Sequence, residues 1–218
     1  MTHARVHERR RLKAHEHPHN KSHYHQHHAH VALHEKEIQL PMGGVFAGNK
    51  PAVVCTLLGS CVAACLFDPL ARVGGMNHIL LPGRMQPGSE GLATRYGVNA
   101  MELLINRIMS LGGNKRQLRA KLFGGAMMFR FSPQMPAVSK MNCSFALQFL
   151  ESEGIPVDGY QLGGTHAVRV RFHVTTGKAF VKMVPRTDMA ALLGREEMQE
   201  ARIYRAASQV TSHNVELF

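Results

Sequence analysis

Cys61 and His78 are the two residues whose types and spacing suggest covalent chemistry. Each lies in a short apolar run, at 61–67 and 76–81, and turn-forming residues separate the two runs. If the runs pair as an antiparallel hairpin centred between Pro69 and Leu70, Cys61 and His78 are equally far from the turn and face each other. Directly opposed residues share a face of the sheet, with Cβ atoms about 5 Å apart. The spacing therefore predicts a thiol beside an imidazole, whereas a register change of one residue would place them on opposite faces.

A thiol beside an imidazole is the arrangement of a cysteine nucleophile. A free thiol has a pKa of about 8.5, and a neighbouring imidazole lowers it. The thiolate attacks a carboxamide carbon, and the imidazole protonates the departing ammonia and then activates the water that hydrolyses the thioester. The oxyanion formed on the way needs positioned N–H donors. We expect the backbone of Gly59-Ser60-Cys61 to supply them, because glycine lets the backbone come close to a substrate.

Each of the two residues also has a purely structural interpretation. Cys61 lies in an apolar run where a cysteine can pack as a small hydrophobic residue, and His78 can be a hydrogen-bonded core histidine. The other cysteines, Cys55, Cys65 and Cys143, form no C-x-x-C pair. We expect these three to be buried, reduced and unreactive.

The elements that must position this pair follow from the hydrophobic pattern. We predict strands at 51–58, 61–67, 76–81, 118–123, 168–174 and 178–184, and helices at 94–111 and 139–153. The polar, glycine-rich stretch 82–91 is typical of a loop. The elements show no regular βαβ alternation, which favours an α+β fold, an α/β sandwich of packed, mostly antiparallel β-sheets flanked by helices.

Both ends of the chain differ from this body. Eleven of the fifteen histidines fall within 1–36, a segment that cannot bury apolar surface, so we expect a disordered tail there. A solvated tail is the favoured interpretation; weak chelation of a metal ion by His23, His25, His27, His28 and His30 is the alternative. An expression tag is a third, disfavoured by the irregular spacing. Residues 37–186 are the predicted catalytic domain, with no cofactor or metal expected in it, and 187–218 are a charged tail with a predicted helix over 188–207.

Charge and hydropathy narrow the range of partners. The formal net charge of +11 favours acidic partners. The chain has no tryptophan and its Lys and Arg are scattered, which argues against nucleic-acid binding. No apolar run reaches about 18 residues, so no membrane insertion is predicted. The N-terminal charges precede no apolar stretch of the kind a signal peptide needs, so we expect a cytoplasmic protein.

The sequence blocks around the pair resemble the chemoreceptor glutamine deamidase family, CheD. They are Thr56-Leu57-Leu58-Gly59-Ser60-Cys61-Val62-Ala63, Asp68-Pro69 and Gly74-Gly75-Met76-Asn77-His78. Further matches are Lys121-Leu122-Phe123-Gly124-Gly125-Ala126, Asn142, Gly163-Gly164 and Thr176-Gly177. The resemblance covers roughly 38–185 and leaves both tails outside it.

The resemblance implies an α/β sandwich and an enzyme that hydrolyses selected glutamine side chains of methyl-accepting chemotaxis receptors to glutamate. It maps the nucleophile onto Cys61 and the base onto His78. It also suggests receptor methyl-ester hydrolysis as a further activity and a CheC-type phosphatase as a partner. The alternative is a non-catalytic member that binds receptor or phosphatase. A peptidase of another family ranks last, because the papain-type signature is absent.

One position departs from the family pattern. The family usually has a threonine six residues before the nucleophile, which orients the histidine. Here Cys55 occupies that position and Thr56 follows it. A hydroxyl is a better hydrogen-bond partner than a thiol. We therefore predict that Thr56 is the third catalytic member, re-aimed by a small bulge near Gly59, with Cys55 as the alternative.

Overall fold

The structure is a computed structural model that describes residues 36–81, 90–127 and 135–185, together with positions 194, 195, 198, 199, 201, 202 and 205. The predicted histidine-rich tail, with its five candidate metal ligands, lies outside the described residues except for Lys36. Most of the predicted C-terminal tail and most of the predicted loop at 82–91 lie outside them too.

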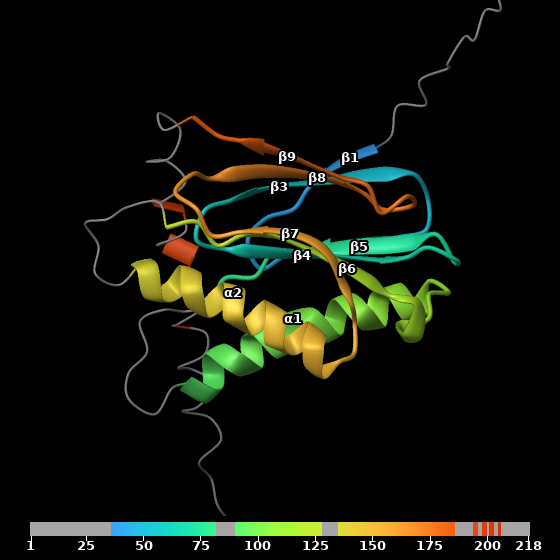
Figure 1. The fold of residues 1–218 in the computed structure, drawn as a ribbon, viewed down its shortest axis with the longest axis horizontal. Helices are drawn as coiled ribbons and strands as arrows, with labels where there is room; N and C mark the ends of the chain where they lie inside the picture. The colour runs from blue at the N-terminus through green and yellow to red at the C-terminus, as the bar shows by residue number, and fades with distance from the viewer. Residues whose placement is uncertain are drawn as a thin grey trace, which may run out of the picture. The chain divides into compact units, whose positions relative to one another are not determined.

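Two sheets, two α-helices and a short 3-10 turn make up the described part of the chain up to residue 185, and the described positions between 194 and 205 are helical (Figure 1). The outer sheet has the order β1 (Lys36–Gln39), β3 (Ala52–Leu58), β8 (Val168–His173) and β9 (Ala179–Met183). The central sheet has the order β2 (Val45–Gly48), β5 (Val73–Asn77), β4 (Val62–Asp68), β6 (Arg119–Gly124) and β7 (Val157–Leu162). The helices are α1 (Glu90–Ser110), α2 (Met135–Ser152) and the short 3-10 turn η1 (Lys115–Gln117).

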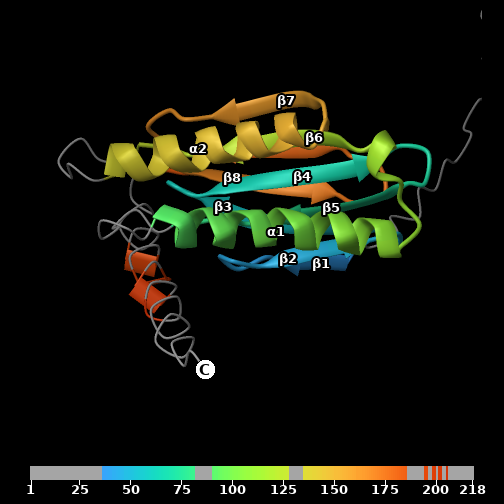
Figure 2. The ribbon, with the colours of Figure 1, turned by 90° about the horizontal axis from the view of Figure 1, so that it is seen from below.

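The layers are stacked as outer sheet, central sheet and helix pair. Helices α1 and α2 lie next to each other across the face of the central sheet that points away from the outer sheet (Figure 2). Strand pairs are antiparallel except β1 with β3 and β6 with β7. The predicted α+β sandwich of mostly antiparallel sheets is therefore confirmed.

Strand β4 shows why the central sheet is buried on both faces. Its alternate residues Val62, Ala64 and Leu66 pack against the helices. Ala63 and Cys65, together with Cys61 just before the strand, pack against the outer sheet. Side chains on a strand alternate between faces, so a nearly continuous apolar run is what a sheet covered on both sides requires.

The structure corrects several predicted boundaries. Strand β5 ends at Asn77, so 78–81 continue beyond it, and α1 begins at Glu90, inside the stretch predicted to be a loop. Strands β1, β2 and β7 were not predicted. The predicted register of the hairpin is also wrong. Cys65 pairs with Met76 and Val62 with Ile79, so Cys61 is opposite Leu80 rather than His78.

Candidate active site

The register error of the hairpin amounts to two residues, and this preserves the predicted face. His78 lies opposite Ala63, two positions along from the pairing of Cys61 with Leu80. Because side chains repeat every second residue, a shift of two keeps Cys61 and His78 on one face. That face of the central sheet points into the layer between the two sheets. There the exposed fraction of Cys61 is 0% and that of His78 is 2%.

The backbone of His78 is held by a turn that precedes β2. Gly43 N–H donates to His78 O at 2.9 Å, and His78 N–H donates to Gly44 O at 3.0 Å. Gly43 has φ +75°, and a Cβ at that position would lie 2.6 Å from the Tyr96 hydroxyl oxygen of α1. Only glycine meets both conditions, so this turn fixes the backbone of His78 and packs closely against the Tyr96 hydroxyl.

The ring of His78 is oriented by a residue of the outer sheet. Thr56 Oγ1 lies 2.8 Å from His78 Nδ1, and the same hydroxyl donates its proton to Leu40 O at 2.9 Å. A hydroxyl has one proton, so Nδ1 must carry the hydrogen of the Thr56–His78 bond. This places the lone pair of the neutral ring on Nε2.

His78 Nε2 is the atom that a catalytic base would use. It is buried and makes no hydrogen bond to any described residue, Cys61 included. A buried polar atom without a protein partner is unusual in a folded protein, which makes Nε2 a candidate functional atom. In unliganded enzymes, catalytic hydrogen bonds often form only when substrate is present.

The electrostatic surroundings keep the ring neutral. Burial lowers the pKa of His78 to about 4, and the nearby Leu40 carbonyl opposes this shift. Desolvation disfavours the charged imidazolium, which explains the direction. Near neutral pH the ring is therefore an acceptor, as a general base must be before the reaction begins.

Strand alternation separates Thr56 from Cys55. Ala52, Val54 and Leu58 face the inter-sheet core, so Thr56 faces it too. Cys55 faces the other side of the outer sheet, where burial and a hydrogen bond to Glu37 raise the pKa of its thiol to about 11. The β3–β8 register runs unbroken from Val53 to Leu58, so the predicted bulge does not interrupt this strand and is not needed. The reason to expect a non-catalytic protein was that a thiol holds the orienting position. Because Cys55 faces the other side of the sheet, that reason does not apply.

Three consecutive carbonyls hold the segment that contains Cys61. Gly59 O accepts from Ala126 N–H and Cys61 O from Gly125 N–H, each at 2.7 Å. Ser60 O accepts from the side-chain Nδ2 of Asn142 at 2.9 Å. The predicted oxyanion donors belong to this same segment, and their backbone orientation is fixed by these contacts.

The loop after β6 can approach Cys61 only because it contains glycines. A Cβ on Gly124 would lie 2.2 Å from Cys61 O, and one on Gly125 would lie 2.1 Å from Cys143 Sγ. Both residues have positive φ, +106° and +67°. The Gly-Gly pair therefore lets the loop bind the backbone of the candidate nucleophile.

The remaining cysteines are poor nucleophiles. All four cysteines are free thiols. Burial is the main cause of a raised pKa at Cys65 and at Cys143, as it is at Cys55. A raised pKa reduces the thiolate fraction near neutral pH, which is the reactive form.

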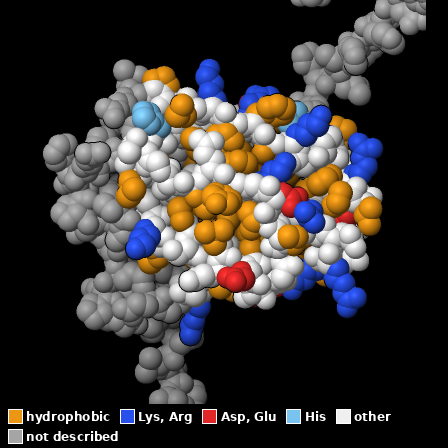
Figure 3. Space-filling view, viewed as in Figure 1, with side chains coloured by type: hydrophobic (Ala, Val, Ile, Leu, Met, Phe, Trp, Pro, Cys, Tyr) orange, Lys and Arg blue, Asp and Glu red, His pale blue; other side chains and the backbone are white. Residues whose placement is uncertain are grey.

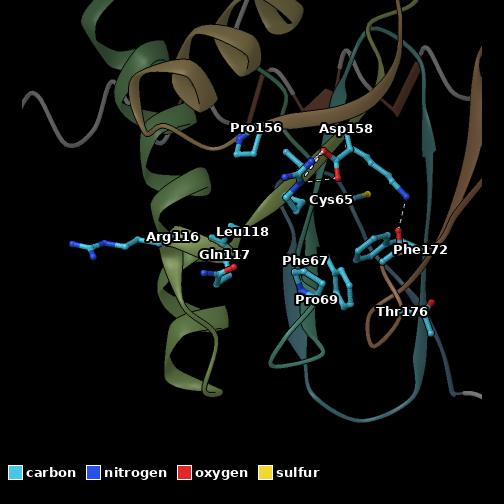
Figure 4. A pocket seen from close by; sticks show the side chains of 14 residues that line it. Cys65, Phe67, Pro69, Arg116, Gln117, Leu118, Pro156, Asp158, Phe172 and Thr176 are labelled. Atoms are coloured by element: carbon cyan, nitrogen blue, oxygen red, sulfur yellow. Dashed lines mark hydrogen bonds and ion pairs between the residues drawn. The ribbon is translucent and has the colours of Figure 1, made fainter.

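A separate cavity lies apart from this site. A cavity of about 420 Å³ opens at the other end of β4, beside Phe67 and Phe172, with Arg119 paired to Asp158 in its wall (Figure 4). It contains none of the candidate catalytic residues.

Among the described residues, no group of three or more His, Cys, Asp or Glu side chains is placed to hold a metal ion. No helix in this part of the chain is long and apolar enough to cross a membrane.

Sequence reasoning identified some residues of the candidate site and missed others. Cys61, His78 and Thr56 were predicted, and the structure brings His78 and Thr56 into contact in the layer that also contains Cys61. Tyr96 was missed, and Asn142 was noticed only through the resemblance and without a role. Asn142 is a fully buried polar residue on the apolar side of α2. A polar residue among the apolar positions of a helix was the one sequence signal that pointed to it.

The fold and the site together define a two-sheet α+β protein with a thiol, an imidazole and a hydroxyl gathered between its sheets. A family model described as CheD chemotactic sensory transduction matches residues 80–183. A probable chemoreceptor glutamine deamidase CheD of Vibrio vulnificus is 42% identical over 168 residues, covering 73% of this chain and 77% of the relative. The protein of the same name from Acidiphilium cryptum is 46% identical over 172 residues, covering 78% and 86%. The chain belongs to the CheD family.

A solved structure, Neisseria meningitidis protein NMB0706, has a distant likeness to the chain. Its TM-score is 0.38 at 13% sequence identity, covering 62% of this chain and 65% of that one.

Proposed function

We propose that this protein hydrolyses glutamine side chains of chemoreceptors to glutamate, with Cys61 as nucleophile, His78 as general base and acid, and Thr56 as the residue that orients His78. The observation that carries the proposal is the contact between Thr56 Oγ1 and His78 Nδ1, which directs the unprotonated Nε2 into the layer that contains Cys61. The names of the relatives supply the substrate class.

The first half-reaction forms a thioester. The Cys61 thiol gives its proton to His78 Nε2, and the sulfur attacks the side-chain carbonyl carbon of glutamine. The tetrahedral intermediate collapses as the C–N bond breaks, and the departing nitrogen takes the proton from His78 and leaves as ammonia. Nδ1–H stays hydrogen-bonded to Thr56 throughout, so the ring keeps one orientation while its charge changes.

The second half-reaction restores the enzyme. His78 Nε2 takes a proton from water, the hydroxide attacks the thioester carbon, and the C–S bond breaks. The proton returns to the sulfur, which leaves glutamate and the free thiol. The imidazolium exists only beside a thiolate or an oxyanion, whose negative charge offsets the desolvation that disfavours it in the resting enzyme.

The positive net charge of the protein favours a substrate with an acidic surface. Lys and Arg side chains are scattered over the face seen in Figure 3, with few acidic groups among them. A basic protein attracts an acidic surface through its long-range field. We therefore expect substrate association to weaken with rising ionic strength.

The test is incubation of the purified protein with a chemoreceptor cytoplasmic fragment, followed by peptide mass spectrometry and an ammonia assay. Each converted glutamine gains about one dalton, as amide hydrolysis requires. Cys61→Ala under the same conditions is the control for spontaneous deamidation. Absence of conversion by the folded wild-type protein on several receptor fragments would contradict the proposal.

Two finer activities rest on the same site and on the family resemblance. A receptor methyl ester would form the same thioester with methanol as the leaving group, and methanol release from a methylated fragment tests this. A CheC-type phosphatase is the proposed protein partner, and size-exclusion chromatography of the mixed proteins tests that complex.

A further inference from the structure

The side-chain amide of Asn142, on α2, lies at the end of the β4–β5 hairpin. It takes the place of a direct hydrogen bond between two backbone groups there. Val62 and Ile79 exchange both of their backbone hydrogen bonds, at 3.0 and 2.7 Å. In an antiparallel ladder the next such pair lies two residues along each strand, which here is Ser60 with Leu81. In the structure Leu81 N–H donates instead to Asn142 Oδ1 at 2.8 Å, and Asn142 Nδ2 donates to Ser60 O at 2.9 Å.

The side-chain amide of Asn142 thus acts as an inserted peptide group. It accepts from one strand and donates to the other, so neither backbone group loses a partner. The two strands are held apart at this point by the width of an amide instead of closing to direct contact. Asn142 is fully buried, so water does not compete for either hydrogen bond.

The insertion lies between the two segments that contain the proposed catalytic pair. Ser60 directly precedes Cys61, and Leu81 follows His78 by three residues in the opposing segment. A second asparagine interrupts the same hairpin on the other side of the Val62–Ile79 pair, because Ala64 N–H donates to the side-chain Oδ1 of Asn77. The backbone at Cys61 is therefore set by side chains as well as by the regular ladder.

We propose that Asn142 is a positioning residue that wedges the end of the β4–β5 hairpin open and thereby fixes the direction of the Cys61 side chain relative to His78. Its consequence for turnover rests on the proposed function, while its consequence for the backbone and for thiol reactivity does not. Removal of the wedge lets Ser60 and Leu81 bond directly, which moves the backbone on the N-terminal side of Cys61. A displacement of about 1 Å in a reacting group can cost on the order of 100-fold in rate.

The experiment compares Asn142→Ala with Leu150→Val, a matched control. Leu150 is fully buried on the same helix and packs in the helix-facing core, so its truncation lowers stability without touching the hairpin. For Asn142→Ala we expect kcat to fall about 100-fold with KM changed by less than about threefold, and alkylation of Cys61 by iodoacetamide to change by at least about tenfold. For Leu150→Val both rates should stay within about twofold of wild type.

A crystal structure of Asn142→Ala supplies the readout that is independent of activity. A direct Leu81 N–H to Ser60 O hydrogen bond is expected there, and an unchanged separation of the two strands would overturn the proposal. If Asn142→Ala does not fold, Asn142→Ser, which keeps a polar group too short to bridge both strands, takes its place in every measurement. Rates in either folded variant that match Leu150→Val would also overturn the wedge, whereas a fully active Cys61→Ala would overturn the proposed function and leave the crystallographic result standing.

Discussion

Thr56 Oγ1 and His78 Nδ1 lie 2.8 Å apart although they belong to different sheets. Thr56 is on β3 of the outer sheet, and His78 follows β5 of the central sheet. The same hydroxyl donates to Leu40 O, in the segment that follows β1. The imidazole is therefore fixed by the packing of one sheet on the other, and any change that alters the spacing of the sheets also alters the tautomer and direction of the ring.

Replacement of the nucleophile is the first prediction. Cys61→Ala should reduce glutamine deamidation by several orders of magnitude, as deletion of an attacking group does in other hydrolases. The loss of one buried sulfur should cost no more than about 2 kcal/mol of unfolding free energy. Ammonia release and urea unfolding measure the two effects. Turnover at the wild-type rate would exclude Cys61 as the nucleophile.

The second prediction concerns the orienting hydroxyl. Thr56→Ala should lower kcat about 10-fold or more, because the His78 ring loses the partner of Nδ1. Thr56→Ser keeps the hydroxyl and should recover most of the rate. Cys55→Thr should have little effect, since that side chain faces Glu37 on the other side of the sheet. Steady-state kinetics of the three variants, with folding checked by circular dichroism, test the assignment; equal rates in Thr56→Ala and wild type would contradict it.

Thiol reactivity offers a test that needs no receptor. Cys61 should be the fastest of the four cysteines to alkylate near pH 7, because burial raises the pKa of Cys55, Cys65 and Cys143. Iodoacetamide labelling with peptide mapping gives the order. His78→Gln should slow the labelling of Cys61 selectively. First reaction at Cys143 would argue against an activated thiol at Cys61.

The buried imidazole also predicts how stability depends on pH. The pKa of His78 is about 4 in the folded protein and about 6.5 when the chain unfolds, so between these values the unfolded state binds the extra proton. Stability should therefore fall as the pH is lowered from 6.5 toward 4, by up to about 3 kcal/mol from this residue. Urea unfolding between pH 7.5 and 4.5 measures the slope. His78→Gln should flatten it, and an identical slope in the variant would show that other groups cause the dependence.

The sequence by itself determined the main secondary structure and the shared face of Cys61 and His78, the proposed catalytic pair. Apolar runs and helical periodicity are local signals, and six strands and two helices were predicted from them, with shifted ends. Alternation along a strand has a period of two, so Cys61 and His78 remain on one face even though the hairpin register is offset by two residues. Strands β1 and β7 are mostly polar and contain no long apolar run, and β2 is only four residues long. Pairing with neighbouring strands defines them instead.

Only the tertiary structure decided which residues complete the site. Thr56 meets His78 because two sheets pack face to face, and no local pattern records the distance between sheets. Asn142 reaches Ser60 and Leu81 from a helix that lies far along the chain from both. The burial of a polar side chain is affordable only when its hydrogen-bond partners are in place. Those partners are backbone groups, which carry no side-chain signature, so the sequence marks the asparagine as unusual and the fold alone shows what it holds.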